Sequence, residues 1–313
     1  MRFLQPLADK GGLEVRIDSH GKSCEEKELL GGISGVVVAI PSNDAYTARV
    51  FEAADALRII ARTGVGYNTI DLEAATAKGV VVTTSVGKNA DSVAEHTLSL
   101  MLASARRTVW IDKGFRAGGW ADLRRPLSPL KGKILGILGM GHIGKAVARR
   151  AAAFGMKILA HDPMRDEKFA AEVGVFFHSI EEVVVQADFL SCHLPLLPET
   201  KGLLGKVLIS RMKPGSFLIN TSRGEVVDID ALADSLREEK IGGAALDVFP
   251  HEPPERTHPI FSLDNVILTP HVAGLGLDAC EASLRHAVRC ALDLLEGKRP
   301  PDVVNSQVYD KTG

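Results

Sequence analysis

The chain has 313 residues, of which 45% are hydrophobic and 24% are charged, so it is long enough for two globular domains of ordinary composition. Its net charge of −2 gives no electrostatic attraction to nucleic acid or to an anionic membrane surface. No apolar run approaches the roughly 20 residues of a membrane span. The four cysteines are scattered without a metal-binding spacing, so we expect reduced thiols, a cytoplasmic location and no metal.

Short apolar runs alternate with segments of helical spacing over about the first ninety residues, which is typical of a small parallel sheet. The expected strands and helices are strands 36–40, 58–62 and 80–83 and helices 45–56 and 71–78. A further strand is expected before residues 13–17. Only residues 1–4 are available for it, so either that strand is very short or the chain begins late.

A long helix is expected over residues 91–107, and it is apolar on several faces, which indicates burial. Residues 114–129 contain glycines, prolines and arginines and are expected to form a loop. The next stretch, KILGILGMGHIG (133–144), joins a buried strand to a glycine turn and to a helix over 143–154. Strand, glycine turn and helix in this order are typical of a dinucleotide-binding unit.

Each glycine of this turn has an expected purpose. Gly139 permits the tight turn, Gly141 lets the backbone approach a pyrophosphate, and Gly144 lets the helix pack against the strand. The next predicted strand, 157–161, ends at Asp162, which is 162 − 144 = 18 residues after the last glycine. A carboxylate there accepts from a ribose 2′-hydroxyl and repels a 2′-phosphate, which favours NAD. The nearby Arg165 leaves NADP as the alternative.

Strand and helix signals alternate again after residue 162. The expected elements are strands 175–177, 189–192, 216–220, 243–247 and 266–268, and helices 180–186, 229–239 and 276–296, followed by a polar, proline-marked tail. Because the glycine turn lies in mid-chain between two long helices, we expect a Rossmann-type doubly wound parallel sheet inserted into a smaller flavodoxin-like α/β domain. The substrate domain would comprise residues 1–92 and 276–313, and the NAD-binding domain residues 93–275.

Three polar stretches follow predicted strands, and parallel strands bring their carboxyl ends to one edge of the sheet. They contain Arg223, Glu252 and His271. Arginine can hold a carboxylate or polarise a carbonyl, and histidine can transfer a proton near neutral pH. A carboxylate such as Glu252 can fix the imidazole tautomer. The structural alternatives are that Arg223 caps a helix or pairs with Glu225, that Glu252 is a solvated loop residue, and that His271 is a buried histidine with its hydrogen bonds satisfied.

The sequence resembles the D-isomer-specific 2-hydroxyacid dehydrogenase family over most of residues 55–275. The matching stretches are RTGVGYNTIDL (62–72), NADSVAEHTLSLMLASARR (89–107), GKILGILGMGHIG (132–144), HLPLLPETKGL (193–203), MKPGSFLINTSRGEVVD (212–228), GGAALDVFPHEPP (242–254) and TPHVAG (269–274). The resemblance implies an NAD-dependent oxidoreductase that interconverts a D-2-hydroxy acid and a 2-oxo acid, and a homodimer with the helix from Asp91 at its interface.

The resemblance also implies roles for individual residues. Arg223 would bind substrate, His271 would be the acid/base and Glu252 its partner. Asp247 would hold the nicotinamide carboxamide, and Val65 and Gly66 would donate backbone N–H groups to the substrate carboxylate. The remaining expected cofactor contacts are His142, Ile143, His193, Pro195, Thr200, Thr221, His271 and Gly274.

The identity of the substrate stays open. Arg62 and Lys88 could suit a second anionic group, as in 3-phosphoglycerate, or they could be solvated or paired with neighbouring carboxylates. Glyoxylate and hydroxypyruvate are alternative substrates. Phosphite oxidation is a rival reaction, and a dinucleotide-sensing protein similar to corepressors of this fold is a rival of another class.

Overall fold

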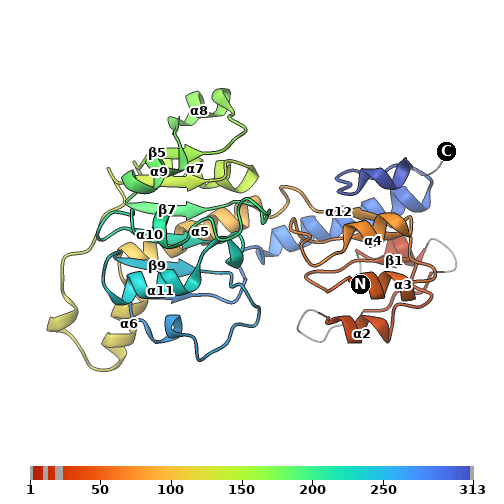
Figure 1. Ribbon diagram of the computed structural model, residues 1–313, viewed down its shortest axis with the longest axis horizontal. Helices are drawn as coiled ribbons and strands as arrows, with labels where there is room; N and C mark the ends of the chain where they lie inside the picture. Colours follow the sequence, from red (N-terminus) through yellow and green to blue (C-terminus); the bar gives the residue numbers. More distant parts are fainter. Residues whose placement is uncertain (1–2, 10–12, 18–23, 311–313) are drawn as a thin grey trace. The chain divides into compact units, whose positions relative to one another are not determined.

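The computed structural model describes residues 3–9, 13–17 and 24–310. The chain forms two compact units, of which the smaller combines Met1–Asn89 with Leu275–Gly313 and the larger is Ala90–Gly274 (Figure 1). These limits lie close to the predicted domain boundaries. The functions assigned to the two domains stay predictions.

The larger unit contains a seven-stranded sheet in the order β10-β9-β8-β7-β4-β5-β6, with every pair of neighbours parallel. The strands are β4 (Ile134–Leu138), β5 (Lys157–His161), β6 (Val175–Phe177), β7 (Phe189–Cys192), β8 (Phe217–Asn220), β9 (Gly243–Leu246) and β10 (Val266–Leu268). All seven predicted strands are confirmed. The chain enters at β4, winds outward to β6 and then returns to β7 on the other side, which confirms the doubly wound Rossmann-type fold.

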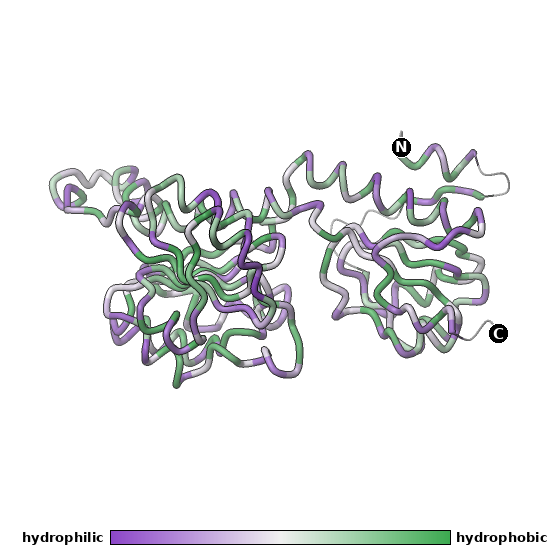
Figure 2. Tube along the Cα trace, turned by 90° about the horizontal axis from the view of Figure 1, so that it is seen from above, coloured by the Kyte–Doolittle hydropathy of each residue, from purple (hydrophilic) through white to green (hydrophobic). Residues whose placement is uncertain are grey.

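Both faces of this sheet are buried, which explains its near-continuous apolar strands. Leu135, Ile137 and Leu138 of β4 have no exposed surface. The hydrophobic residues accordingly gather along the central strands in Figure 2. One face packs against α9 (Ile180–Gln186), α10 (Lys206–Ile209) and α11 (Ile229–Arg237), and the other against α5 (Ala90–Ala105), α7 (His142–Ala153) and α8 (Glu167–Val173).

The predicted loop over 114–129 is wrong at its start, because α6 (Thr108–Arg116) extends into it and the short helix η1 (Ala121–Leu123) lies inside it. Arg107 separates α5 from α6, since its φ of 50° is left-handed and cannot continue a helix. The helices α8 and α10 were also not predicted. The remaining short helices of this unit are η2 (Gly224–Val226) and η3 (Pro259–Ser262).

The smaller unit contains a parallel sheet in the order β1-β2-β3 among its described residues. Its elements are α1 (Gln5–Ala8), α2 (Glu26–Leu30), β1 (Val38–Ala39), α3 (Ala48–Ala53), β2 (Ile59–Ala61), α4 (Leu72–Ala77), β3 (Val81–Thr83), α12 (Leu277–Leu295) and η4 (Ser306–Tyr309). The strand expected before residues 13–17 is wrong for residues 3–9, which form a turn and α1 with a proline in its first turn. Residues 1–2 and 10–12 lie outside the described residues.

The polar tail completes this small sheet. Val303 forms an antiparallel bridge with Thr83, so the tail covers the outer edge of β3. The buried side chain of Asn305 accepts from the N–H of Val82 at 2.8 Å and donates to the carbonyl of Val80 at 2.9 Å. The tail looks like a solvated segment in the sequence, yet it pairs with backbone N–H and carbonyl groups of β3 that would otherwise be exposed at an open strand edge.

We expect Asn305→Ala to lower the free energy of unfolding by about 2–6 kcal/mol, because two buried backbone groups lose their partners at about 1–3 kcal/mol each. Thermal or urea unfolding measures this loss. Ser306→Ala is the matched control, because Ser306 is exposed and should change stability by less than about 0.5 kcal/mol. Equal stability of the two variants would contradict this account of the tail.

Candidate active site

The glycine turn after β4 has three different steric demands. Gly139 has a φ of 94°, and a Cβ there would lie 2.7 Å from the carbonyl oxygen of His193. A Cβ on Gly144 would lie 2.0 Å from the carbonyl oxygen of Gly139, whereas one on Gly141 would meet no atom within 4 Å. The first and third glycines are thus required by the fold itself. The open space at Gly141 is what a bound pyrophosphate needs.

The positions around the turn also suit a dinucleotide. Helix α7 begins at His142, so its first N–H groups and its dipole point at the turn. Asp162, directly after β5, accepts from the N–H of Met140 and of Met164, each at 2.7 Å. Each carboxylate oxygen keeps a further acceptor position. Asp162 is therefore fixed beside the turn and can still accept from a ribose hydroxyl.

Alanine substitutions separate the two kinds of glycine. We expect Gly144→Ala to lower stability by about 1–3 kcal/mol or more, because the new methyl group overlaps backbone. Gly141→Ala should leave the melting temperature nearly unchanged and weaken NADH binding at least about tenfold, since its methyl group enters the space left for the phosphates. Thermal melting and NADH fluorescence titration measure both effects. Native NADH affinity in Gly141→Ala would contradict the assignment of this space.

The segment after β7 is held in place by hydrogen bonds between uncharged groups. His193 pairs through Nε2 with Ser191 Oγ at 2.8 Å, and burial lowers its pKa to about 3, so the ring is neutral. Thr200 Oγ1 donates to the carbonyl of Pro195 at 2.6 Å and accepts from the N–H of Leu197 at 2.8 Å. These contacts fix the turn over 195–200, and none of them uses a charged group.

Arg223 lies on the loop after β8, and Asn220 shapes this loop. The Asn220 amide donates to the carbonyl of Arg223 at 2.9 Å and accepts from the N–H of Ser222 at 3.0 Å. Burial lowers the pKa of the Arg223 guanidinium, while the carboxylates of Glu252 and Glu225 act in the opposite direction. Arginine remains a cation under such conditions. A half-buried cation therefore lies at the carboxyl end of the sheet.

His271 and Glu252 form a close pair. Nδ1 of His271 lies 2.6 Å from Oε2 of Glu252, and Oε1 of Glu252 accepts from the N–H of Phe249 at 3.0 Å. The His271 backbone has a φ of 55° and donates to the carbonyl of Asp247 at 2.7 Å. A carboxylate that accepts at Nδ1 leaves Nε2 as the atom that can exchange a proton. The predicted pairing of these two residues is confirmed, and both side chains are about one-third exposed.

The loop that carries Arg223 touches the loop that carries Glu252 through backbone atoms. A Cβ on Gly224 would lie 2.0 Å from the carbonyl carbon of Phe249 and 2.3 Å from the nitrogen of Pro250. Glycine is therefore the residue that permits this approach. The absence of a side chain at residue 224 sets how closely Arg223 and Glu252 approach each other.

Asp247 is fully buried between these loops. Its carboxylate accepts from Thr269 Oγ1 at 2.5 Å, from the N–H of Val272 at 3.0 Å and from the N–H of Ala273 at 2.9 Å, and it lies 3.5 Å from His96 Nε2. Burial acts to raise its pKa, but these donors outweigh that effect and hold the pKa below its usual value. Asp247 is thus a carboxylate at neutral pH.

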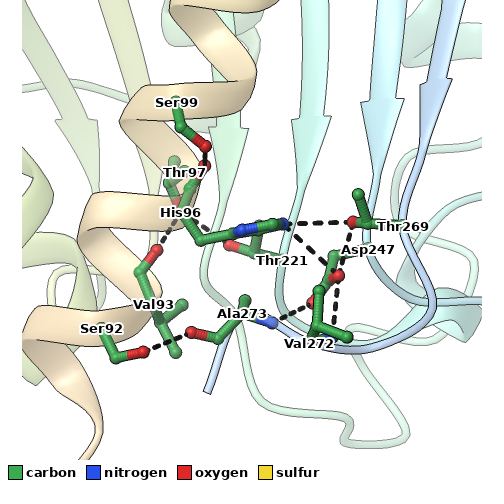
Figure 3. A network of polar contacts seen from close by, with 10 residues as sticks. All are labelled: Ser92, Val93, His96, Thr97, Ser99, Thr221, Asp247, Thr269, Val272 and Ala273. Carbon is green, nitrogen blue, oxygen red and sulfur yellow. Dashed lines mark hydrogen bonds and ion pairs between the residues drawn. The ribbon is translucent and has the colours of Figure 1, made fainter. Parts of the chain in front are cut away.

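Helix α5 contributes polar contacts that the sequence did not reveal (Figure 3). His96 Nε2 lies 3.1 Å from Thr269 Oγ1, Thr97 Oγ1 lies 3.0 Å from Thr221 Oγ1, and Ser92 Oγ donates to the carbonyl of Ala273 at 2.7 Å. The one available signal is the four-residue spacing of Ser92 and His96, which places them on one side of the helix. Their partners are more than a hundred residues away in sequence.

In the smaller unit, the segment over 62–66 follows β2. Arg62 is 4% exposed, and its guanidinium donates to the carbonyl of Ser42 at 2.5 Å and to the side chain of Asn43. Ser85 donates from its N–H to the carbonyl of Gly64 at 3.0 Å. Hydrogen bonds at Arg62 and at Gly64 therefore fix the chain directly before Val65 and Gly66, and all of them lie within this unit.

The doubly wound sheet, the glycine turn and the histidine–glutamate pair together define a dinucleotide-dependent oxidoreductase. The model of the NAD binding domain of D-isomer specific 2-hydroxyacid dehydrogenases matches residues 98–273. The chain belongs to this family. It is therefore an NAD-dependent oxidoreductase that acts on CH–OH groups.

Three similar proteins indicate the range of the family. The chain is 43% identical over 272 residues to a glyoxylate reductase of Korarchaeum cryptofilum, covering 85% of this chain and 81% of that one. It is 39% identical to a D-3-phosphoglycerate dehydrogenase of Mycobacterium leprae, covering 86% of this chain but 52% of the relative. The D-lactate dehydrogenase of Aquifex aeolicus, solved with NAD and lactic acid, superimposes with a TM-score of 0.86 at 27% identity, covering 97% and 96% of the two chains.

Among the described residues, no helix combines the length and the apolar character that crossing a bilayer would require.

Proposed function

We propose that the protein reduces small unphosphorylated 2-oxo acids, such as glyoxylate and hydroxypyruvate, and oxidises the matching D-2-hydroxy acids. The observation that carries this proposal is the 2.6 Å contact between His271 Nδ1 and Glu252 Oε2 at the carboxyl end of a Rossmann sheet. Such a pair moves a proton, and a proton must be moved when a carbonyl becomes a hydroxyl.

Each residue has a defined role in this mechanism. Arg223 holds the substrate carboxylate and polarises the carbonyl oxygen. Glu252 keeps the Nδ1 proton of His271, so that Nε2 donates a proton to the new alkoxide during reduction and accepts it during oxidation. Bound NAD(H) supplies the chemistry of hydride transfer at C2. In the smaller unit, Val65 and Gly66 would donate backbone N–H groups to the substrate carboxylate.

The cofactor would be held by the glycine turn and by the segments that follow the strands. His142 and Ile143 would donate N–H groups to the pyrophosphate, and Asp162 would accept from the adenosine ribose. Asp247 would accept from the nicotinamide carboxamide. The other proposed contacts are His193, Pro195, Thr200, Thr221, His271 and Gly274.

Two observations support an unphosphorylated substrate over 3-phosphoglycerate. The guanidinium of Arg62, which was expected to suit a phosphate, already donates to Ser42 and Asn43. The chain is also 43% and 42% identical to two glyoxylate reductases, against 39% for each of two D-3-phosphoglycerate dehydrogenases. Phosphohydroxypyruvate is therefore the alternative substrate against which glyoxylate and hydroxypyruvate must be compared.

The proposal includes a homodimer and a cytoplasmic location. Helix α6 and the residue before η1 expose apolar side chains, with Val109 54%, Phe115 56% and Trp120 64% exposed. A cavity of about 620 Å³ lies nearby, lined by residues of α5, α6 and β10. Apolar side chains on a protruding segment are typical of a subunit interface.

Sedimentation of the native protein and of Trp120→Glu tests the dimer, since the variant should shift toward the mass of the monomer.

The substrate is tested by following NADH loss with glyoxylate, hydroxypyruvate, pyruvate and phosphohydroxypyruvate. We expect the highest kcat/KM with glyoxylate or hydroxypyruvate. A higher kcat/KM with phosphohydroxypyruvate would replace the proposed substrate by the phosphorylated one. Tight NADH binding without turnover of any of these acids would favour a dinucleotide-sensing protein instead.

A further inference from the structure

Asp247 has a single acceptor position without a donor among the residues that the structure describes. A carboxylate has four lone-pair positions, two on each oxygen. Thr269 and Val272 use both positions on Oδ1, and Ala273 uses one of the two on Oδ2. Because Asp247 is fully buried, this open acceptor position calls for a further donor, which a bound ligand can supply.

The hydroxyl of Thr269 connects this carboxylate to helix α5. Its one proton is donated to Asp247 Oδ1 at 2.5 Å, so toward His96 the oxygen can only accept. His96 Nε2 lies 3.1 Å from that oxygen and must therefore carry a proton. The result is a directed chain from His96 through Thr269 to Asp247, and each hydrogen bond fixes the direction of the next.

The same helix holds the neighbouring segments in place. Thr97 contacts Thr221, and Ser92 binds the carbonyl of Ala273, whose N–H is the donor to Asp247 Oδ2 (Figure 3). Helix α5 thus contacts the Thr269 hydroxyl, which occupies one acceptor position of the carboxylate, and the backbone segment that occupies two more. Its central polar side chain is His96, with 21% of that side chain exposed.

We infer that His96 is a positioning residue for cofactor recognition, which through Thr269 orients Asp247 so that the open position on Oδ2 receives one N–H of the nicotinamide carboxamide. This inference rests on the proposed role of Asp247 in binding the cofactor. His96 itself touches neither the reacting atoms nor the carboxamide. Loss of the His96 side chain should therefore reduce the preference for a nicotinamide that carries the carboxamide, rather than weaken the binding of every such dinucleotide equally.

The test compares NADH with its 3-acetylpyridine analogue, in which a methyl group replaces the carboxamide NH₂ and so cannot donate. Fluorescence titration gives Kd for both forms, without substrate or turnover. We expect native protein to bind NADH about tenfold or more tightly than the analogue, as for a hydrogen bond to a charged acceptor. In His96→Ala and Thr269→Val, this preference should fall to about threefold or less.

Two further variants distinguish positioning from general damage. His96→Gln places an amide N–H at a similar reach and should restore most of the preference. Ser99→Ala is the matched control on the same helix, because Ser99 Oγ donates only to the carbonyl of His96, and it should keep the native preference. Melting temperatures are recorded for all variants.

The outcomes separate the inference from the proposed function. Full preference for NADH in His96→Ala would overturn the role of His96 and leave that of Asp247 intact. If His96→Ala raised Kd equally for NADH and for the analogue and also lowered the melting temperature, His96 would have a merely structural role. That result would also overturn the inference. Equal affinities in the native protein would overturn the role of Asp247 itself.

Discussion

His271→Gln is expected to lower kcat by about 10²–10⁴-fold, the range that loss of general acid–base catalysis produces. Glutamine keeps a polar group of similar size but cannot exchange a proton at the position of Nε2. Because the proposed contacts of the glycine turn and Asp162 are to the distant parts of the dinucleotide, Kd for NADH should stay nearly unchanged. Steady-state kinetics and NADH titration on the same preparation give both values.

His251→Gln is the matched control for this substitution, because His251 is exposed and lies next to Glu252 in the sequence. It should retain native kcat. If His271→Gln were as active as this control, His271 would not be the acid/base, and the mechanism would lose its proton donor.

Gly224→Ala is expected to lower kcat/KM by about 10²-fold or more. The added methyl group would lie 2.0 Å from a backbone carbon of Phe249, so the two loops must separate. Arg223 would then move relative to Glu252 and His271, and a displacement of about 1 Å in an active site can cost about 10²-fold in rate. Kinetics with hydroxypyruvate and a thermal melt measure the effect.

Gly32→Ala is the control for this variant, because a Cβ on Gly32 meets no atom within 4 Å and its backbone conformation suits any residue. It should retain both native activity and native stability. Gly224→Ala with native kcat/KM would show that the contact between the two loops does not set the geometry of the site.

The strands were predictable because burial on both faces of a parallel sheet demands uninterrupted apolar residues. Helix α8 has cap residues at both ends that the sequence displays, since Asp166 caps its first turn by accepting from the N–H of Phe169 and Gly174 follows its last residue in a left-handed conformation. Helix α6 was less accessible to prediction, because it begins after Arg107, a non-glycine residue in a left-handed conformation. Sequence offers no rule for that choice.

The paired acid and base were predictable because both follow strands of one parallel sheet, so topology alone brings them to the same edge. The chain from His96 to Asp247 was not predictable, since its members come from a helix and two loops that are far apart in sequence. The same holds for Gly224, whose requirement for glycine arises from backbone about 25 residues further along. In both cases the decisive contact is tertiary, and no local pattern encodes it.

The most direct test of the central claim is the configuration of the product formed from hydroxypyruvate and NADH. In the proposed mechanism Arg223 would hold the substrate and His271 would supply the proton from loops of the same sheet, so hydride should reach one face of the carbonyl. We predict that NADH is consumed and that the glycerate formed is the D-isomer. Formation of L-glycerate or of a racemate would contradict the account, as would the absence of NADH consumption with every 2-oxo acid.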